Sequence, residues 1–322
     1  MAKLALLTSG GDAPGMNSAI RAVVRTALAK GIEVIGIRHG FSGLLAGDSI
    51  HMNSRSVANI MHLGGTILHT SRCLEFKTKE GRAPAVAFLD KAKVDFLVII
   101  GGNGTLQGSA ALSEETETKI VQIPSTIDND VYGTDFTIGF DTAVNTALDA
   151  IDRIRDTAFS LDRLFFVEVM GREAGFIALE AGIAGGAVEV LIPEIIENMD
   201  QLSRSIQDAF KRGKKACITV VAEGDRPGGA FEVAKEVKAL TGLDSRVCIL
   251  GHTQRGGSPT ARDRVLAIKL GVAAIETLLQ GENAVVIGEV CGQIVRTPLK
   301  EAREKKKQLD HFLVELLKLV SG

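Results

Sequence analysis

Short apolar runs alternate with amphipathic segments of helical period along most of this 322-residue chain. Residues 3–7 form the first apolar run, residues 17–30 carry an apolar face at helical spacing, and residues 33–37 form the next run. Apolar runs of this length, bounded by glycine-rich turns, are typical of strands that are buried on both faces of a parallel sheet. The pattern therefore predicts βαβ units and an α/β fold.

The alternation continues through two sets of predicted elements, and the first set ends near Gly139. We expect two Rossmann-like three-layer α/β/α domains with mostly parallel sheets. Residues 1–138 plus about 251–300 would form the first domain, and residues 139–250 plus about 301–322 the second. The other predicted strands are 94–100, 119–123, 164–170, 188–192, 216–222, 246–250 and 284–288, and the other predicted helices are 106–112, 141–158, 174–184, 200–211, 230–240, 261–279 and 309–319.

Composition narrows the class of protein without naming a function. Hydrophobic residues make up 45% of the chain, charged residues 24%, and the net charge is −2, which argues against disorder, a nucleic-acid partner or a membrane partner. The apolar runs are too short to span a bilayer, and the N-terminus lacks a cleavage-site pattern. The cysteines are scattered without metal-ligand spacing, so we expect free thiols in a reducing cytoplasm. They are Cys73, Cys217, Cys248 and Cys291.

The segment Pro124–Asp130 directly follows the apolar run 119–123 and carries the first candidate chemistry. Ligands of open α/β sheets bind at the carboxyl ends of strands. Two carboxylates two positions apart, Asp128 and Asp130, beside the hydroxyl of Thr126 suit a general base and a substrate clamp. An Asx-turn is the structural alternative, because Asp and Asn often bond their own backbone after a strand. The segment alone does not decide between the two.

Two glycine turns connect predicted strands to helices and suit phosphate groups. Gly10, Gly11 and Gly15 in the first turn let a ligand approach the backbone, and the following helix directs its free N–H groups toward it. The second turn, Gly101–Thr105, offers the same amides and places Asn103 to touch a metal or a phosphate oxygen. Neither turn matches the P-loop or the dinucleotide fingerprint, which disfavours a nicotinamide oxidoreductase.

Several cationic side chains lie at comparable strand ends. Planar, permanently charged guanidinium groups suit a multiply phosphorylated ligand. A phosphoryl-transfer site needs little more than positioning and charge neutralisation. These residues are Arg72, Arg163, Arg172, Arg246, His252 and Arg255.

Four segments resemble the bacterial ATP-dependent 6-phosphofructokinases, and the resemblance extends over nearly the whole chain. It implies transfer of the ATP γ-phosphoryl group to the 1-hydroxyl of fructose 6-phosphate, with Mg²⁺, in a cytoplasmic homotetramer. The first predicted domain would bind the nucleotide and the second the sugar phosphate. The segments are Thr8–Asn17, Pro124–Asp130, Val167–Arg172 and Leu250–Pro259.

The resemblance also implies roles for individual residues. Asp128 would take the proton from the sugar hydroxyl, while Thr126 and Asp130 would support the transferring group and Mg²⁺. Arg72 would bridge toward the moving phosphoryl group, and Arg163 and Arg246 would reach the 6-phosphate from a neighbouring subunit. The nucleotide would contact Gly11, Arg72, Cys73, Gly102, Asn103, Gly104 and Thr105, and the sugar phosphate would contact Thr126, Ile127, Asp128, Met170, Gly171, Arg172, Glu223, His252 and Arg255.

The chain departs from the family pattern at Asn103, where an aspartate normally serves the magnesium. At an effective dielectric of about 20, a unit charge about 4 Å away contributes on the order of 4 kcal/mol before desolvation. We therefore hypothesise weak metal affinity or a slow enzyme. A catalytically weak, regulatory subunit that binds sugar phosphate or nucleotide is the alternative.

Two further comparisons with the family concern the phosphoryl donor and regulation. Pyrophosphate-dependent relatives typically carry an aspartate at the position of Gly104 and a lysine at that of Ser125, so this chain favours ATP. Val188, Ser54 and Leu161 replace residues usual in or near the family's effector site for ADP or phosphoenolpyruvate, so regulation could be altered or lost. The residues that match the basic wall of that site are Arg21, Arg25, Arg155, Arg212, Lys214 and Lys215.

Overall fold

The computed structural model describes residues 2–196 and 198–320, and the chain divides into two compact units. Unit 1 comprises Met1–Thr126, Asp130–Asp141 and Arg255–Lys307. Unit 2 comprises Ile127–Asn129, Thr142–Gln254 and Gln308–Gly322. Each unit has its own sheet and its own apolar core.

Unit 1 is built on a seven-stranded sheet with the order β11-β10-β5-β4-β1-β2-β3. The five inner strands run parallel, while β3 and β11 pair antiparallel with β2 and β10 at the two edges. The inner strands are mostly apolar because helices cover both faces of the sheet. Their bounds are β1 Lys3–Ser9, β2 Glu33–Ile37, β3 Ser49–Met52, β4 Phe96–Gly101, β5 Lys119–Pro124, β10 Val285–Val290 and β11 Gln293–Pro298.

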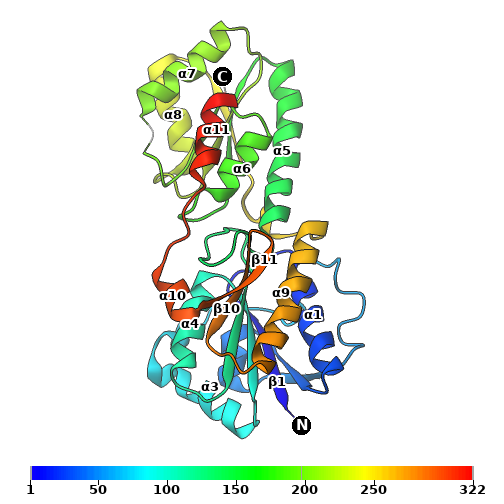
Figure 1. Ribbon diagram of the computed structural model, residues 1–322. Helices are drawn as coiled ribbons and strands as arrows, with labels where there is room; N and C mark the ends of the chain where they lie inside the picture. The colour runs from blue at the N-terminus through cyan, green and yellow to red at the C-terminus, as the bar shows by residue number, and fades with distance from the viewer. Residues whose placement is uncertain (1, 197, 321–322) are drawn as a thin grey trace. The chain divides into compact units, whose positions relative to one another are not determined.

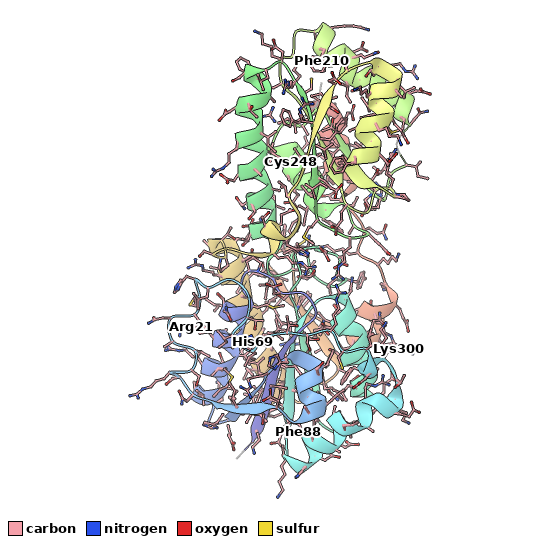
Figure 2. The ribbon with its side chains drawn as sticks, turned by 180° about the vertical axis from the view of Figure 1, so that it is seen from behind. Arg21, His69, Phe88, Phe210, Cys248 and Lys300 are labelled. Atoms are coloured by element: carbon pink, nitrogen blue, oxygen red, sulfur yellow. The ribbon has the colours of Figure 1, made fainter. Side chains whose placement is uncertain are left out.

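Two groups of helices cover this sheet. Helices α1 (Met16–Ala29) and α9 (Ala261–Leu279) pack against each other on one face (Figure 1). The other face carries a core that includes Leu7, Leu97 and Leu106, with Phe88 of α3 packed against it (Figure 2). The helices of that face are α2 Gly40–Ala46, α3 Lys79–Lys91, α4 Asn103–Ser113 and α10 Leu299–Glu304, with the short 3₁₀ helix η1 Glu75–Lys77.

Unit 2 contains a smaller, fully parallel sheet with the order β7-β8-β6-β9. Helices α7 and α8 pack on one face, where Phe166, Ile206 and Val233 belong to one buried cluster and Phe210 packs against it (Figure 2). Helix α6 packs on β7 and β8, and α11 packs on α6 (Figure 1). The bounds are β6 Leu164–Val169, β7 Glu189–Leu191, β8 Cys217–Ala222, β9 Ser245–Ile249, α6 Phe176–Ala184, α7 Met199–Lys211, α8 Gly229–Thr241 and α11 His311–Val320.

The predicted α/β class with mostly parallel sheets is confirmed, and the long helix predicted over residues 141–158 is α5 (Phe140–Ser160). One boundary needs correction: the helix expected near residues 106–112 already begins at Asn103, because the Gly102 carbonyl accepts the Leu106 N–H. The pattern missed β3, β11, α2, α3 and α10, which are edge or partly exposed elements. Over the described residues, no helix is long and apolar enough to cross a membrane.

Candidate active site

The glycine turn after β4 forms the first turn of a helix and presents backbone donors. Gly102 precedes α4, so the N–H groups of Asn103, Gly104 and Thr105 belong to the first turn, where a helix has no internal acceptors for them. The Thr105 hydroxyl donates to the Ser9 carbonyl at 3.0 Å and so joins this turn to the end of β1. Such a helix terminus suits a phosphate group.

Gln122 supports this turn from the neighbouring strand β5, and the sequence reading missed it. Its side chain is fully buried, and its Nε2 donates to the carbonyls of Gly101 at 3.1 Å and Gly102 at 3.3 Å. The signal in the sequence was a polar residue inside an apolar run. A buried polar side chain in such a run normally has a backbone partner.

The Thr126–Asp130 segment approaches the same turn through its unit 1 residues. Nδ2 of Asn103 donates to the Asp130 carbonyl at 3.1 Å, and a Cβ atom built on Gly102 would lie 3.0 Å from Cβ of Thr126. Asn129 adopts the left-handed conformation with φ +52°, which asparagine tolerates better than most residues. The segment therefore contains a tight turn at Asn129, and its candidate carboxylates Asp128 and Asp130 flank that turn.

The donor set of this segment fits Mg²⁺ held largely by a substrate. Asp130 and the amide oxygen of Asn103 are hard oxygen donors, and Mg²⁺ usually takes one or two protein carboxylates plus phosphate oxygens. In residues 2–196 and 198–320, no group of three or more His, Cys, Asp and Glu side chains could hold a metal ion.

A cavity of about 570 Å³ adjoins the start of α4 and brings Cys73 and Gly104 together. Two of its walls are the rings of Phe41 and Phe76, which stack with centroids 3.9 Å apart. A Cβ atom on Gly108 would lie 2.7 Å from Cε2 of Phe41, so glycine is needed to fit the rings against the helix. The other lining residues, all absent from the sequence prediction, are Lys77, Arg82, Gln107, Ala111 and Arg303.

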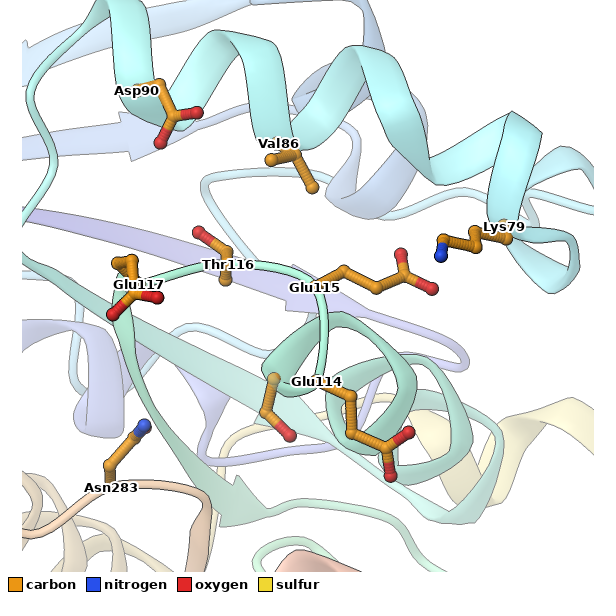
Figure 3. A pocket seen from close by; sticks show the side chains of 9 residues that line it. Lys79, Val86, Asp90, Glu114, Glu115, Thr116, Glu117 and Asn283 are labelled. Atoms are coloured by element: carbon orange, nitrogen blue, oxygen red, sulfur yellow. The ribbon is translucent and has the colours of Figure 1, made fainter.

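A second cavity of unit 1, about 630 Å³, is lined mainly by acidic side chains (Figure 3). Asp90, Glu114, Glu115 and Glu117 line it, with Lys79 as its cation. The hydrogen bond from Arg82 lowers the pKa of the Glu115 carboxyl, and the two side chains form an ion pair at 2.6 Å. These carboxylates would repel a phosphate group, whereas the lining of the cavity at α4 includes Lys77, Arg82 and Arg303.

Arg255 lies against the first glycine turn. A Cβ atom built on Gly11 would lie 3.2 Å from Nη1 of Arg255, so the guanidinium packs closely on this backbone. The Thr70 hydroxyl donates to the Gly10 carbonyl at 2.7 Å and ties the segment before Arg72 to the same turn. Unit 1 thus brings its predicted phosphate-binding residues to the carboxyl ends of β1 and β4.

Unit 2 holds the candidate base. Asp128 is 3% exposed, and its Oδ2 lies 3.4 Å from Nε of Arg172. The Arg172 N–H donates to Oε1 of Glu223 at 2.8 Å, and the Met170 N–H donates to Oε1 of Gln254 at the same distance. The structure therefore brings Asp128, Met170, Arg172 and Glu223 together, and it adds Gln254, which the sequence reading had not selected.

Arg163 and Arg246 lie at the other end of this sheet. They stand at the amino ends of the neighbouring strands β6 and β9, whereas Arg172 follows the carboxyl end of β6. The pKa of Asp244 is lowered chiefly by a hydrogen bond from Lys238 and also by the charges of both arginines, which places them near each other. Six strand residues span about 20 Å. Unit 2 therefore does not bring these arginines to Arg172.

The predicted effector residues have mixed surroundings. Nη2 of Arg155 donates to the carbonyls of Gly185 and Gly186, and Arg21 donates to the Val57 carbonyl at 2.9 Å. Val188 is 2% exposed and belongs to the unit 2 core. Arg25, Arg212 and Lys215 are exposed, Lys214 is half-buried, and Lys215 lies 5.9 Å from the ring centroid of Phe159.

Comparison with known proteins places this geometry in a family. A family profile described as Phosphofructokinase matches residues 3–278. The chain is 53% identical over 321 residues to ATP-dependent 6-phosphofructokinase 1 of Thermus thermophilus, with 100% of both chains covered. It is 50% identical over 319 residues to ATP-dependent 6-phosphofructokinase 2 of Bacteroides thetaiotaomicron, covering 99% of this chain and 98% of that one.

The solved structure of phosphofructokinase from Saccharomyces cerevisiae is similar with a TM-score of 0.88 and 37% identity. It matches 94% of this chain, which corresponds to 45% of the yeast chain. The profile, the full-length relatives and the solved structure agree. The chain belongs to the phosphofructokinase family.

Proposed function

We propose that this protein transfers the γ-phosphoryl group of ATP to the 1-hydroxyl of fructose 6-phosphate, which yields fructose 1,6-bisphosphate and ADP in glycolysis. Relatives about half identical over their whole length are named ATP-dependent 6-phosphofructokinases. The observation within the chain that carries the proposal is the buried Asp128 carboxylate beside the Arg172 guanidinium.

Asp128 acts as the general base. As the bond from the sugar O1 to the γ-phosphorus forms, the hydroxyl proton passes to the Asp128 carboxylate. The bond from the γ-phosphorus to the bridging oxygen breaks, and ADP leaves with its electron pair. Only an ionised carboxylate can accept this proton. The Arg172 guanidinium, with Nε 3.4 Å from Oδ2, lies beside that carboxylate.

We assign the nucleotide to unit 1. The first-turn N–H groups of α4 receive phosphate oxygens, the cavity with Phe41 and Phe76 receives the base, and Arg72 neutralises charge on the moving group. Mg²⁺, which Asp130 and Asn103 would help to hold, neutralises phosphate charge when bound. Open space surrounds a Cβ at Gly104, so an acidic side chain would fit there and repel ATP.

We assign the sugar phosphate to unit 2, where Met170, Gly171, Arg172, Glu223 and His252 follow the carboxyl ends of its strands. Arg255 belongs to unit 1 and keeps only the role that the family resemblance implies. The distance of Arg163 and Arg246 from Arg172 along β6 supports a role in a site of a second copy of this chain. We therefore propose a closed homo-oligomer, a homotetramer by family resemblance.

The regulatory-subunit alternative is not favoured, since the full-length relatives are named as kinases. We retain from it the expectation that Asn103 weakens Mg²⁺ binding. For effectors, we propose that the basic residues bind an anion such as ADP or phosphoenolpyruvate without a metal ligand at position 188, because Val188 lies in the core. The free thiols support a place in the reducing cytoplasm.

A steady-state assay with ATP, GTP and pyrophosphate as donors, across a Mg²⁺ titration, tests the proposed function. We expect turnover of fructose 6-phosphate with ATP, no turnover with pyrophosphate, and a high Mg²⁺ requirement. Formation of fructose 1,6-bisphosphate only from pyrophosphate, or no turnover at any Mg²⁺ concentration, would contradict it.

A further inference from the structure

The loop after strand β6 has a positive φ at two successive residues. Gly171 has φ +146°, and a Cβ atom built on it would lie 2.4 Å from the Ala174 carbonyl oxygen. Arg172 has φ +53°, a left-handed conformation that few non-glycine residues adopt. Such a conformation persists only where surrounding contacts hold it in place.

The two strands that flank β6 supply these contacts. Glu223 follows β8 and accepts the N–H of Arg172, while Gln254 lies beyond β9 and accepts the N–H of Met170, each at 2.8 Å. Since the sheet order is β7-β8-β6-β9, the two acceptors come from opposite sides of β6. The Gly171 residue lies between the two anchored N–H groups.

Gly224 restricts the loop further. A Cβ atom built on Gly224 would lie 1.7 Å from the Arg172 carbonyl oxygen, so the two backbones are in direct contact. The N–H of Glu223 also donates to the Val169 carbonyl at 2.9 Å, which fixes the position of that acceptor relative to β6. Little room remains for Arg172 to relax on the β8 side.

Gln254 is the anchor on the β9 side, and it is more buried than the two residues before it. It is 0% exposed, whereas His252 and Thr253 beside it are exposed. Its Nε2 makes no hydrogen bond to any residue that the structure describes. The hydrogen bond from the Met170 N–H satisfies the oxygen of this buried amide.

We propose that Gln254 is a positioning residue for phosphoryl transfer, an inference that rests on the proposed function. Its amide oxygen fixes the Met170 N–H, and this contact fixes the turn at Gly171 and Arg172. This loop then holds Nε of Arg172 at 3.4 Å from Oδ2 of Asp128. Gln254 acts through the backbone of Met170 and does not touch the sugar phosphate.

Two substitutions separate the oxygen of this amide from its nitrogen. Gln254→Met keeps the length of the side chain but removes the acceptor, whereas Gln254→Glu keeps an acceptor oxygen and replaces only the nitrogen. Thr219→Val is the matched control, because Thr219 is fully buried in β8 of the same unit. Each variant is assayed for kcat and for the KM of both substrates, and hydrogen exchange is followed at the Met170 amide.

We expect Gln254→Met to lower kcat/KM for fructose 6-phosphate on the order of 10- to 100-fold, through both kcat and KM, because misplacement of a reacting group is costly. The KM for ATP stays near that of the wild type, and exchange at Met170 accelerates. Gln254→Glu recovers most of the activity and the protection, and Thr219→Val changes neither.

Two results would overturn the proposal. Wild-type kcat/KM in Gln254→Met would remove any positioning role. Loss of activity in Gln254→Glu with Met170 still protected would mean that the amide nitrogen touches the substrate instead. Failure of the wild-type protein to phosphorylate fructose 6-phosphate would refute the proposed function, and the exchange data would still show whether Gln254 anchors the loop.

Discussion

Gly108→Ala is a small change whose effect on nucleotide binding can be worked out from the structure. The added Cβ would lie 2.7 Å from Cε2 of Phe41 and 3.2 Å from Cδ1 of Phe76. In an ordinary helix interior, alanine is more stable than glycine by about 0.5–1 kcal/mol. Overpacking of buried rings costs about 1–3 kcal/mol, so we expect a net loss near 1 kcal/mol.

The same steric conflict should reach the nucleotide, since the two rings line the cavity at α4. If the rings separate and ATP binding weakens by about 1.4 kcal/mol, the KM for ATP rises about tenfold. We expect the KM for fructose 6-phosphate to change little, because none of its assigned residues lines the cavity at α4.

The measurement is thermal unfolding without nucleotide, together with the KM for ATP. Gly104→Ala serves as the control for stability, since a Cβ at Gly104 meets no atom within 4 Å in the described structure. We expect a lower Tm for Gly108→Ala and an equal or higher Tm for Gly104→Ala. A higher Tm for Gly108→Ala with an unchanged KM for ATP would show that the stacked rings do not shape the nucleotide site.

Three further predictions concern charge and burial. Asn103→Asp adds a negative charge for Mg²⁺ but loses the hydrogen bond to the Asp130 carbonyl. We expect a lower Mg²⁺ requirement in the steady-state assay, and an unchanged kcat with unchanged Mg²⁺ dependence would contradict this. Arg82→Met should cost roughly 1–3 kcal/mol at neutral pH, measured by urea unfolding. Because Arg82 lowers the pKa of Glu115 from its ordinary value of 4.5, this stabilisation is present above about pH 4.5 and is lost as the pH falls through the lowered pKa of the folded state. Equal wild-type and variant stability at pH 7 would refute the role of the pair. Burial raises the pKa of the Cys217 thiol, so a thiol reagent should modify Cys217 only on unfolding. Rapid modification of Cys217 in the native protein would contradict this.

The sequence was sufficient for the fold class because the inner strands are apolar on both faces. Leu97 and Val98, on opposite faces of β4, are both fully buried, and the apolar run that contains them predicted a strand without a structure. The start of α4 was not, since Gly104 favours a turn when propensity alone is considered. The first turn is held by contacts from distant segments: the Thr105 hydroxyl donates to the Ser9 carbonyl, and Nε2 of Gln122 donates to the Gly101 and Gly102 carbonyls.

The candidate site was predictable where chemistry lies in one continuous segment, as with Asp128. It was not predictable where a contact joins distant segments. Gln254 and Met170 are separated by 84 positions, and nothing in either segment indicates their hydrogen bond. The stacking of Phe41 on Phe76 likewise depends on packing around α4.

The most direct test of the account is the turnover of Asp128→Asn with saturating ATP and fructose 6-phosphate, beside Asp90→Asn as a control for an exposed carboxylate. The proposed base predicts that kcat falls on the order of 10²- to 10⁴-fold while fructose 6-phosphate still binds. A kcat close to that of the wild type would contradict the assignment of Asp128 as the residue that takes the proton.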